Sequence, residues 1–138
     1  RKKAYLQFMQ EKQLDVQESY IEQGNYSWES GFAAGQRLMA LPDRPTAIFA
    51  ANDLMAIGCM KAIQSAGLNV PNDVSVLGYD NIVMSNLCTP ALSTVDQPKY
   101  RMGAVSVEML LRRIETGAYR ERLELPTYVM QRESVAKI

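Results

Sequence analysis

Short, mostly apolar strands alternate with helical segments along the first part of the chain, and this alternation limits the folds that are open to it. The pattern of apolar residues predicts strands over residues 19–23, 46–51 and 74–78, and helices over residues 27–40 and 54–66. The strand at 46–51 has no polar–apolar alternation, as expected when both faces of a strand are covered. The order of elements therefore predicts an α/β fold with a parallel, Rossmann-like sheet and flanking helices.

The last third of the chain has a different pattern. Residues 93–98 (STVDQP) are expected to be extended, and a long amphipathic helix follows them and ends at Gly117. Residues 123–135 are expected to form one long strand, in which Pro126 indicates an edge position or a bulge. The chain opens with a helical pattern, RKKAYLQFMQEK, and without a methionine, so we expect it to be a piece of a longer protein.

The composition excludes several classes of site. The 138 residues suffice for one domain, and 15 basic residues balance 15 acidic ones, so electrostatics gives this piece no reason to bind nucleic acid unaided. The chain has no histidine, and Cys59 and Cys88 lack metal-ligand spacing, so we expect no metal and no cofactor, and two reduced thiols in a cytoplasmic protein. No apolar run approaches the ~20 residues that cross a membrane.

Polar and aromatic side chains follow three of the predicted strands where each strand ends: Asn25 and Tyr26, Asn52 and Asp53, and Tyr79, Asp80 and Asn81. Ligands bind beyond the carboxyl ends of the strands in open parallel sheets. A carboxylate accepts from two neighbouring hydroxyls, an amide both donates and accepts, and a ring covers an apolar face. The strand ends therefore predict a site for a small polar ligand, which a sugar fits best and a purine nearly as well.

Each of these residues also has a purely structural explanation. Either Asn52 or Asp53 should cap the helix over residues 54–66, Asp80 can serve as a turn former, and Tyr26 can simply pack. The repetition at three strand ends favours binding over these alternatives. Because the chain has neither a histidine base nor a nucleophile motif such as G-x-S-x-G, we expect binding without catalysis and no enzyme activity.

Three motifs, in order and at the right spacing, carry a family resemblance: PTAIFAANDLMAIG, G-L-x-V-P-x-D-V-S-V-x-G-Y-D and T-P-x-L-[ST]-T-[VI]-x-Q. Together they resemble the effector-binding core of the LacI/GalR family of bacterial transcription regulators, from Arg1 to Val135. The resemblance implies a two-lobed, periplasmic-binding-protein-like fold with ligand in the cleft. It further implies that residues 1–97 form most of the C-terminal lobe, 98–122 a crossover helix belonging to the N-terminal lobe, and 123–138 a return strand to the C-terminal lobe.

The resemblance also implies roles for individual residues in effector binding. Asp80, in GYDN, would bind ligand hydroxyls or a ring nitrogen, Asn52 would hydrogen-bond the ligand, and Tyr26 would stack on it. Arg1 lies where the family motif R-x-x-G-F begins, here RKKAY, and Gln97 lies at a crossover, where it contacts either the ligand or only the hinge. With Asn52 assigned to the cleft, the neighbouring aspartate becomes the expected helix cap.

The helix over residues 54–66 is apolar nearly all the way round, whereas a helix on the outside of a lobe should have a polar stripe. Its second stripe is buried either by another segment of the same chain or by a partner subunit. The family resemblance implies dimerisation through this helix and the loop MSNLCTP. A two-fold contact would then place Leu54, Ile57 and Leu87 against their counterparts in the partner.

These observations predict the effector-binding and dimerisation portion of a cytoplasmic LacI/GalR-type regulator. Its effector would be a sugar, a sugar phosphate or a purine, and it would contact operator DNA only through a headpiece absent from this chain. The rival class is an extracytoplasmic sugar-binding protein of a transport system, which shares the fold. A helix-turn-helix or a signal peptide before Arg1 would decide between the two.

Overall fold

The structure is a computed structural model, and it describes residues 1–117 and 122–136. The helices are α1 (Lys2–Glu11), the short 3-10 helix η1 (Glu18–Tyr20), α2 (Trp28–Met39), α3 (Asp53–Ser65), α4 (Met84–Leu87) and α5 (Lys99–Thr116). The strands are β1 (Ala47–Phe49), β2 (Ser75–Tyr79), β3 (Ser93–Asp96) and β4 (Tyr128–Met130).

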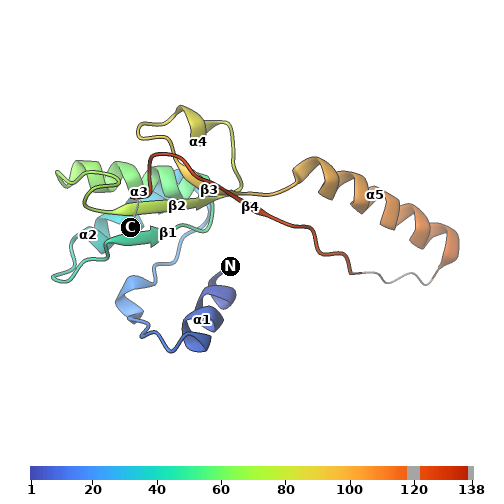
Figure 1. Ribbon diagram of the computed structural model, residues 1–138, viewed down its shortest axis with the longest axis horizontal. Coiled ribbons are helices and arrows are strands. Elements are labelled where there is room, and N and C mark those ends of the chain that lie inside the picture. The colour runs from blue at the N-terminus through green and yellow to red at the C-terminus, as the bar shows by residue number, and fades with distance from the viewer. Residues whose placement is uncertain (118–121, 137–138) are drawn as a thin grey trace.

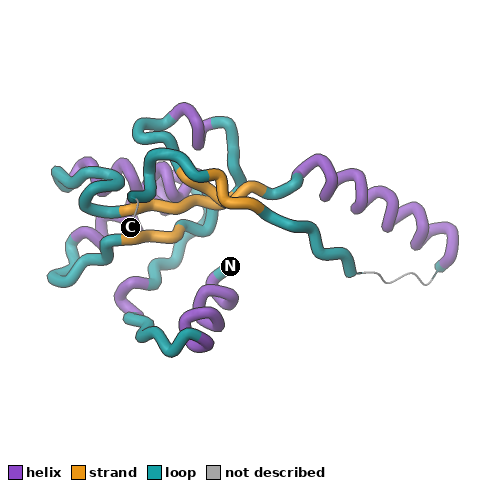
Figure 2. Tube along the Cα trace, in the orientation of Figure 1, coloured by secondary structure: helices purple, strands orange, loops and turns teal. Residues whose placement is uncertain are grey.

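The described strands form one sheet in the order β1-β2-β3-β4 (Figure 2). β1, β2 and β3 are parallel, with Ala47 opposite Ser75 and Leu77 opposite Ser93, which confirms the predicted parallel α/β sheet. β4 lies at the edge and runs antiparallel to β3, with Tyr128 opposite Asp96. The edge position fits Pro126, which has no amide hydrogen to give to a neighbouring strand.

Helix α3 packs against β2, and α2 packs against α3 (Figure 1). The two helices approach so closely that a Cβ added at Gly31 would lie 2.4 Å from the Cα of Met55, and one at Gly58 would lie 2.2 Å from the carbonyl oxygen of Trp28. The apolar circumference of α3 is therefore buried by the sheet on one side and by α2, a segment of the same chain, on another. Of the residues expected at a subunit interface on α3, Leu54 and Ile57 remain partly exposed.

The end of α3 shows how local sequence determines a helix boundary. Gly67 has a φ of 78°, in the left-handed region that favours glycine, and its N–H donates to the carbonyl of Gln64. The next N–H, that of Leu68, donates to the carbonyl of Ile63. This pair of bonds is the Schellman motif, which satisfies carbonyls that the helix itself leaves free, and it confirms the predicted ending.

Two predicted strands are wrong in whole or in part. Residues 19–23 do not form a strand: Glu18–Tyr20 is the 3-10 helix η1, and the residues after it are irregular. The long strand expected over residues 123–135 is limited to Tyr128–Met130. A strand exists only through hydrogen bonds to a neighbouring strand, and the apolar pattern that suggested these two segments does not reveal whether such a neighbour is present.

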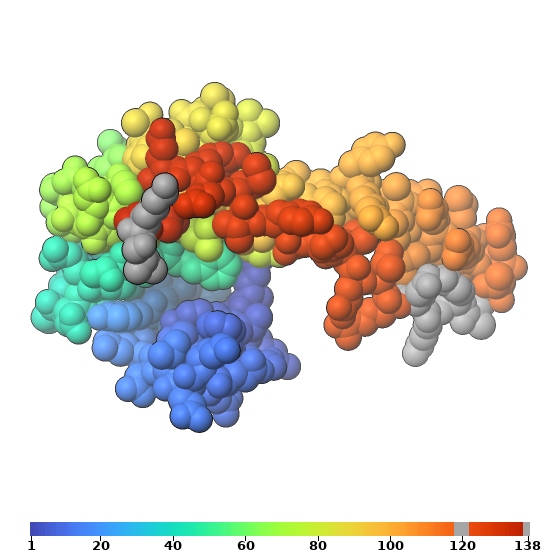
Figure 3. Space-filling model, in the orientation of Figure 1, coloured from blue at the N-terminus to red at the C-terminus, as the bar shows by residue number. Residues whose placement is uncertain are grey.

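Helix α5 projects away from the sheet and its helices (Figures 1 and 3). None of its 18 residues is buried, although an apolar stripe runs along it. The exposed apolar side chains of α5 are Tyr100, Met102, Val107, Leu110, Leu111 and Ile114. Among the described residues, no helix is long and apolar enough to span a membrane.

Candidate functional site

The turn after β2 brings Asp80 to the carboxyl edge of the sheet in an unusual backbone conformation. Asp80 has a φ of 111° and Asn81 a φ of 50°, so two consecutive residues other than glycine have positive φ. Such conformations cost on the order of 1–3 kcal/mol each and persist only where the surroundings fix them. The turn is therefore held by specific contacts, and these contacts decide where the Asp80 carboxylate points.

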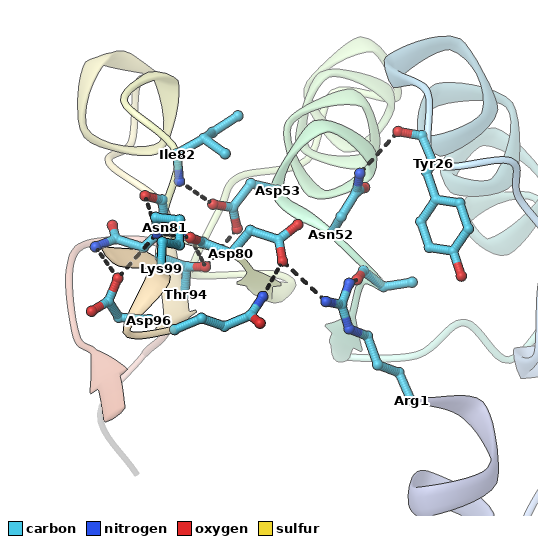
Figure 4. A network of polar contacts seen from close by, with 12 residues as sticks. Arg1, Tyr26, Asn52, Asp53, Asp80, Asn81, Ile82, Thr94, Asp96 and Lys99 are labelled. Atoms are coloured by element: carbon cyan, nitrogen blue, oxygen red, sulfur yellow. Dashed lines mark hydrogen bonds and ion pairs between the residues drawn. The ribbon is translucent and has the colours of Figure 1, made fainter. Parts of the chain in front are cut away.

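Arg1 and Gln97 both donate hydrogen bonds to the same carboxylate oxygen of Asp80. The distance from Arg1 Nη2 to Asp80 Oδ1 is 3.0 Å (Figure 4), and that from Gln97 Nε2 is 2.5 Å. Within the described part of the chain, no residue donates to the second oxygen, Oδ2. Three of the five residues predicted to bind the effector thus meet at one carboxylate, one oxygen of which is left for an incoming donor.

Arg1 also connects this carboxylate to the neighbouring strand ends. Its Nη1 donates to the carbonyl of Ala51, just beyond β1, and its guanidinium lies 3.8 Å from the centroid of the Tyr79 ring at the end of β2. A guanidinium over an aromatic face adds an attractive cation–π interaction. The ion pair with Asp80 is about one-third exposed on both sides, so we expect it to contribute at most about 1 kcal/mol to stability.

Asn52 caps α3, and the expectation that Asp53 would do so is wrong. Asn52 Oδ1 accepts from the backbone N–H of Met55 at 2.9 Å, which is the typical capping bond. Asn52 Nδ2 donates to the carbonyl of Tyr26, also at 2.9 Å (Figure 4). The amide is therefore largely engaged within the chain, with one N–H left for a ligand.

Tyr26, predicted to follow a strand, instead lies in the irregular segment before α2, and its side chain is open to solvent. The residue has a φ of 68°, and the bond from Asn52 holds its carbonyl in this conformation. Its side chain is 62% exposed, so the ring is free to stack on a ligand and is not explained by packing. In Figure 4 the ring projects away from the Asn52 amide.

Asp53 is a site residue whose role sequence reasoning missed. Its carboxylate is fully buried and accepts hydrogen bonds from the backbone of Ile82 and the hydroxyl of Thr94 (Figure 4). It also accepts from the hydroxyl of Ser85. Both asparagine and aspartate are good capping residues, so the sequence near α3 did not separate them. The partners that settle the matter lie about 30 to 40 residues further along the chain.

A second polar cluster supports the turn from the side of β3 and α5. Asn81 Nδ2 donates to Asp96 Oδ1 at 2.9 Å, Arg132 Nη2 donates to Asn81 Oδ1 at 2.7 Å, and Lys99 Nζ donates to the carbonyl of Asp80. The hydrogen bond from Asn81, followed by that from Lys99, holds the pKa of Asp96 below its ordinary value of 3.8. None of the cluster outside the turn was predicted, because only the folded chain brings these residues together.

A cavity of about 760 Å³ coincides with the polar site only in part. Phe49 and Leu77 of the sheet and Met55 of α3 line it, and it reaches Arg1 and Tyr26. Its lining is mainly apolar and does not include Asn52, Asp80 or Gln97. The polar residues at the strand ends therefore define the candidate site, and the cavity does not.

An apolar patch lies on α4 and the adjoining side of α3. We use the term α3–α4 patch for Leu54, Ile57, Val83, Met84 and Leu87. Leu87 is 73% and Val83 79% exposed, whereas Leu54 and Ile57 are partly buried. Bonds from Ser85 to Asp53 and from Gln64 to the carbonyl of Thr89 tie the α4 segment to α3. Val83 is exposed next to Met84, the first residue of the loop MSNLCTP, and the role of the patch as an interface stays a prediction.

Residues 1–135 match a protein family described as the periplasmic binding protein-like domain. The chain belongs to this family. The domain is 39% identical over 137 residues to the HTH-type transcriptional repressor PurR of Edwardsiella ictaluri (strain 93-146), a match that covers 99% of the chain and 40% of that protein. These findings confirm the resemblance to LacI/GalR-type regulators and the fold class that it implied.

Two solved structures resemble the domain closely. A transcriptional regulator CelR–cellobiose complex superimposes with a TM-score of 0.86 and 32% identity, covering 94% of this chain and 40% of that one. The lac repressor dimer bound to operator and the anti-inducer ONPF superimposes with a TM-score of 0.85 and 32% identity, covering 95% and 45%. The domain thus spans less than half the length of these relatives, which are transcriptional regulators and not enzymes.

Proposed function

We propose that this domain is the effector-binding and dimerisation portion of a LacI/GalR-type transcriptional regulator that works in the cytoplasm and catalyses no reaction. The observation that carries the proposal is the Asp80 carboxylate, which Arg1 and Gln97 hold by one oxygen at the carboxyl edge of the sheet. This arrangement occurs in a chain whose named relatives are transcriptional repressors and regulators. Those relatives favour a regulator over a transport-binding protein, the rival class with the same fold.

The effector is a small polar molecule, first of all a sugar or sugar phosphate and second a purine. Asp80 Oδ2 would accept from a ligand hydroxyl or ring N–H, and the remaining amide N–H of Asn52 would donate to it. The exposed ring of Tyr26 would cover an apolar face of the ligand. The solved complex of CelR with cellobiose supports the sugar as first choice.

The unequal burial of the chain supports a division into two lobes. Residues 1–97 form most of one lobe, residues 98–122 cross to the other lobe, and residues 123–138 return; residues 118–121 and 137–138 lie outside those that the structure describes. The bare apolar stripe of α5 supports this division, because a second lobe would cover it. Gln97 touches Asp80 at the start of the crossover, so effector bound there would bias the angle between the lobes.

The α3–α4 patch is the proposed contact between two copies of the regulator. An isologous contact would bury Leu87 with Leu54 and Ile57 on both subunits and hold two DNA-reading headpieces at a fixed spacing. The neighbouring lac repressor structure is a dimer bound to operator, which supports this arrangement. Operator binding belongs to the complete protein, since the balanced charge of this chain gives it little affinity for phosphate.

Calorimetric titration of the complete protein that carries this chain tests the effector class. We expect D-glucose, cellobiose, glucose 6-phosphate or hypoxanthine to bind, and the ligand that binds to change operator affinity in a gel-shift assay. A protein that binds a sugar but no DNA would support the transport class. A protein that binds none of the four would contradict the proposed effector.

A further inference from the structure

The buried carboxylate of Asp53 receives donors from three separate segments of the chain. Its Oδ2 accepts from the backbone N–H of Ile82 at 2.9 Å and from the hydroxyl of Ser85 at 2.5 Å. Its Oδ1 accepts from the hydroxyl of Thr94 at 2.5 Å. The three donors belong to the turn after β2, to α4 and to β3. The carboxylate therefore joins the start of α3 to three of the elements that surround the strand end carrying Asp80.

Strand β2 has a glycine, Gly78, at the point where the Asp53 carboxylate packs against it. A Cβ added at Gly78 would lie 2.2 Å from Asp53 Oδ1, closer than two such atoms can approach. Gly78 is buried and precedes Tyr79 and Asp80 directly. Hence the carboxylate packs against the last part of β2, immediately before the turn, and a side chain at that position would displace it.

Three consecutive backbone N–H groups of the turn are fixed, two of them by way of Asp53. The N–H of Asp80 donates to the carbonyl of Val95 at 3.0 Å. The N–H of Asn81 donates to the hydroxyl oxygen of Thr94 at 3.3 Å, and that hydroxyl in turn donates to Asp53. The N–H of Ile82 donates to Asp53 directly. Asp53 thus governs the turn both directly and through a hydroxyl relay.

We infer that Asp53 is a positioning residue for the effector site: it holds the turn over residues 80–82 in the positive-φ conformation that aims the Asp80 carboxylate at Arg1 and Gln97. Through Ser85 the same carboxylate holds α4, and with it the exposed part of the α3–α4 patch. A carboxylate suits this task because it accepts several hydrogen bonds and donates none. The consequence for ligand binding rests on the proposed function, whereas the consequence for the turn does not.

Hydrogen–deuterium exchange on the complete protein tests the effect on the turn. In the Asp53→Ala variant we expect exchange in residues 80–85 to accelerate at least tenfold, while exchange in α2 and β1 stays at the wild-type rate. The Ile63→Ala variant, which opens a cavity towards the other end of α3, is the matched control, because Ile63 is equally buried but lies ten residues further along the helix than Asp53. Equal acceleration of the turn in both variants, or none in Asp53→Ala, overturns the inference.

The hydroxyl relay offers a second test that does not depend on the folding of the Asp53 variant. Thr94→Val removes the hydroxyl with little change in volume, and Thr94→Ser keeps it. We expect turn exchange to rise severalfold in Thr94→Val and to return towards the wild-type rate in Thr94→Ser. If the two Thr94 variants exchange alike, the relay through Asp53 does not fix the turn.

The effect on ligand binding is measured by calorimetric titration with whichever of D-glucose, cellobiose, glucose 6-phosphate and hypoxanthine binds the wild-type protein. We expect its dissociation constant to rise at least tenfold in Asp53→Ala and less than twofold in Ile63→Ala. If both variants lose affinity equally, Asp53 acts only through global stability. If no probe binds the wild-type protein, the proposed effector class fails, and the exchange measurements alone decide the role of Asp53.

Discussion

Helices α3 and α5 are both rich in apolar residues, yet their surroundings in the structure are opposite. Eight of the 13 residues of α3 are buried, because α2, β2 and the α4 segment surround it. None of the 18 residues of α5 is buried, although its stripe includes Val107, Leu111 and Ile114. The sequence of a helix thus shows which of its faces needs a partner, and the fold shows whether the partner is part of the same lobe.

This contrast changes how the apolar circumference of α3 is explained. Sequence reasoning left open whether the second stripe of α3 met another segment or a partner subunit. Helix α2 covers most of it, which leaves Leu54 and Ile57 as the part of α3 that a partner would bury. No residue in the described part of the chain covers the apolar stripe of α5. A partner for this stripe therefore has to be sought outside those residues.

The largest effect that the contrast predicts is on the buried side of α3. Ile63 is fully buried. We expect Ile63→Ala to lower the free energy of unfolding by about 2–5 kcal/mol, because buried apolar surface is lost and a cavity remains. Chemical denaturation monitored by circular dichroism measures the change. A loss below about 1 kcal/mol would mean that α3 is not the centre of the core.

The partly exposed side of α3 gives the second test. Ile57→Asp would place a carboxylate in the proposed subunit contact, at a cost of several kcal/mol if it stays buried and unpaired. We expect the complete protein to sediment as a monomer at micromolar concentration and to lose operator affinity. Gln36→Asp, on an exposed position of α2, is the control and should remain a dimer. A dimeric Ile57→Asp protein would remove this part of α3 from the interface.

The third test asks whether the proposed effector site at the carboxyl edge of the sheet can be changed without loss of the fold. Asp80→Ala should weaken effector binding by about 1.5–3 kcal/mol, or roughly ten- to over a hundredfold, because a charge-assisted hydrogen bond is lost. The fold should persist, since the Arg1–Asp80 ion pair is partly exposed. Asp43→Ala removes an exposed carboxylate elsewhere and should leave calorimetric affinity unchanged. An Asp80→Ala protein with wild-type affinity would refute the assignment.

Local chemistry was predictable from the sequence, and long-range pairing was not. Gly67 and Leu68 predicted the end of α3 because a Schellman ending needs only neighbouring residues. The strand over residues 19–23 failed because its apolar pattern does not reveal a pairing partner. The cap of α3 was assigned to Asp53 and not to Asn52 because the choice depends on hydroxyls far away in sequence.

The candidate site shows the same division. The polar strand ends and the family resemblance predicted Asp80 as an effector-binding residue, and the resemblance added Arg1 and Gln97. The structure joins both of these residues to Asp80 by hydrogen bonds, which the sequence did not predict. Their contact with a ligand stays a prediction. Lys99 and Arg132, which support the turn, were missed because neither lies in a recognisable motif and their partners come from other segments.

The pH dependence of the turn is a smaller effect. The pKa of Asp96 lies below 3.8 because Asn81 and Lys99 hydrogen-bond to its ionised form. A depressed folded-state pKa contributes stability that is present above the unfolded value and is lost as the pH falls through the folded value. We therefore expect a slight loss of stability below about pH 3.8 that Asp96→Asn abolishes, measured by thermal unfolding from pH 6 to pH 2.5. An unchanged acid profile in Asp96→Asn would show that this carboxylate does not contribute.

In the isolated chain the smallest effect is expected on α5, and this test bears most directly on the contrast between the two helices. Leu111 is exposed, so Leu111→Ala in the 138-residue chain should change the free energy of unfolding by less than about 0.5 kcal/mol. In the complete protein the same substitution should cost about 2–5 kcal/mol, because the second lobe would bury this side chain. Glu108→Ala, also exposed on α5, is the control and should be nearly neutral in both proteins. If Leu111→Ala is as mild in the complete protein as in the isolated chain, no second lobe covers α5, and the proposed crossover is wrong.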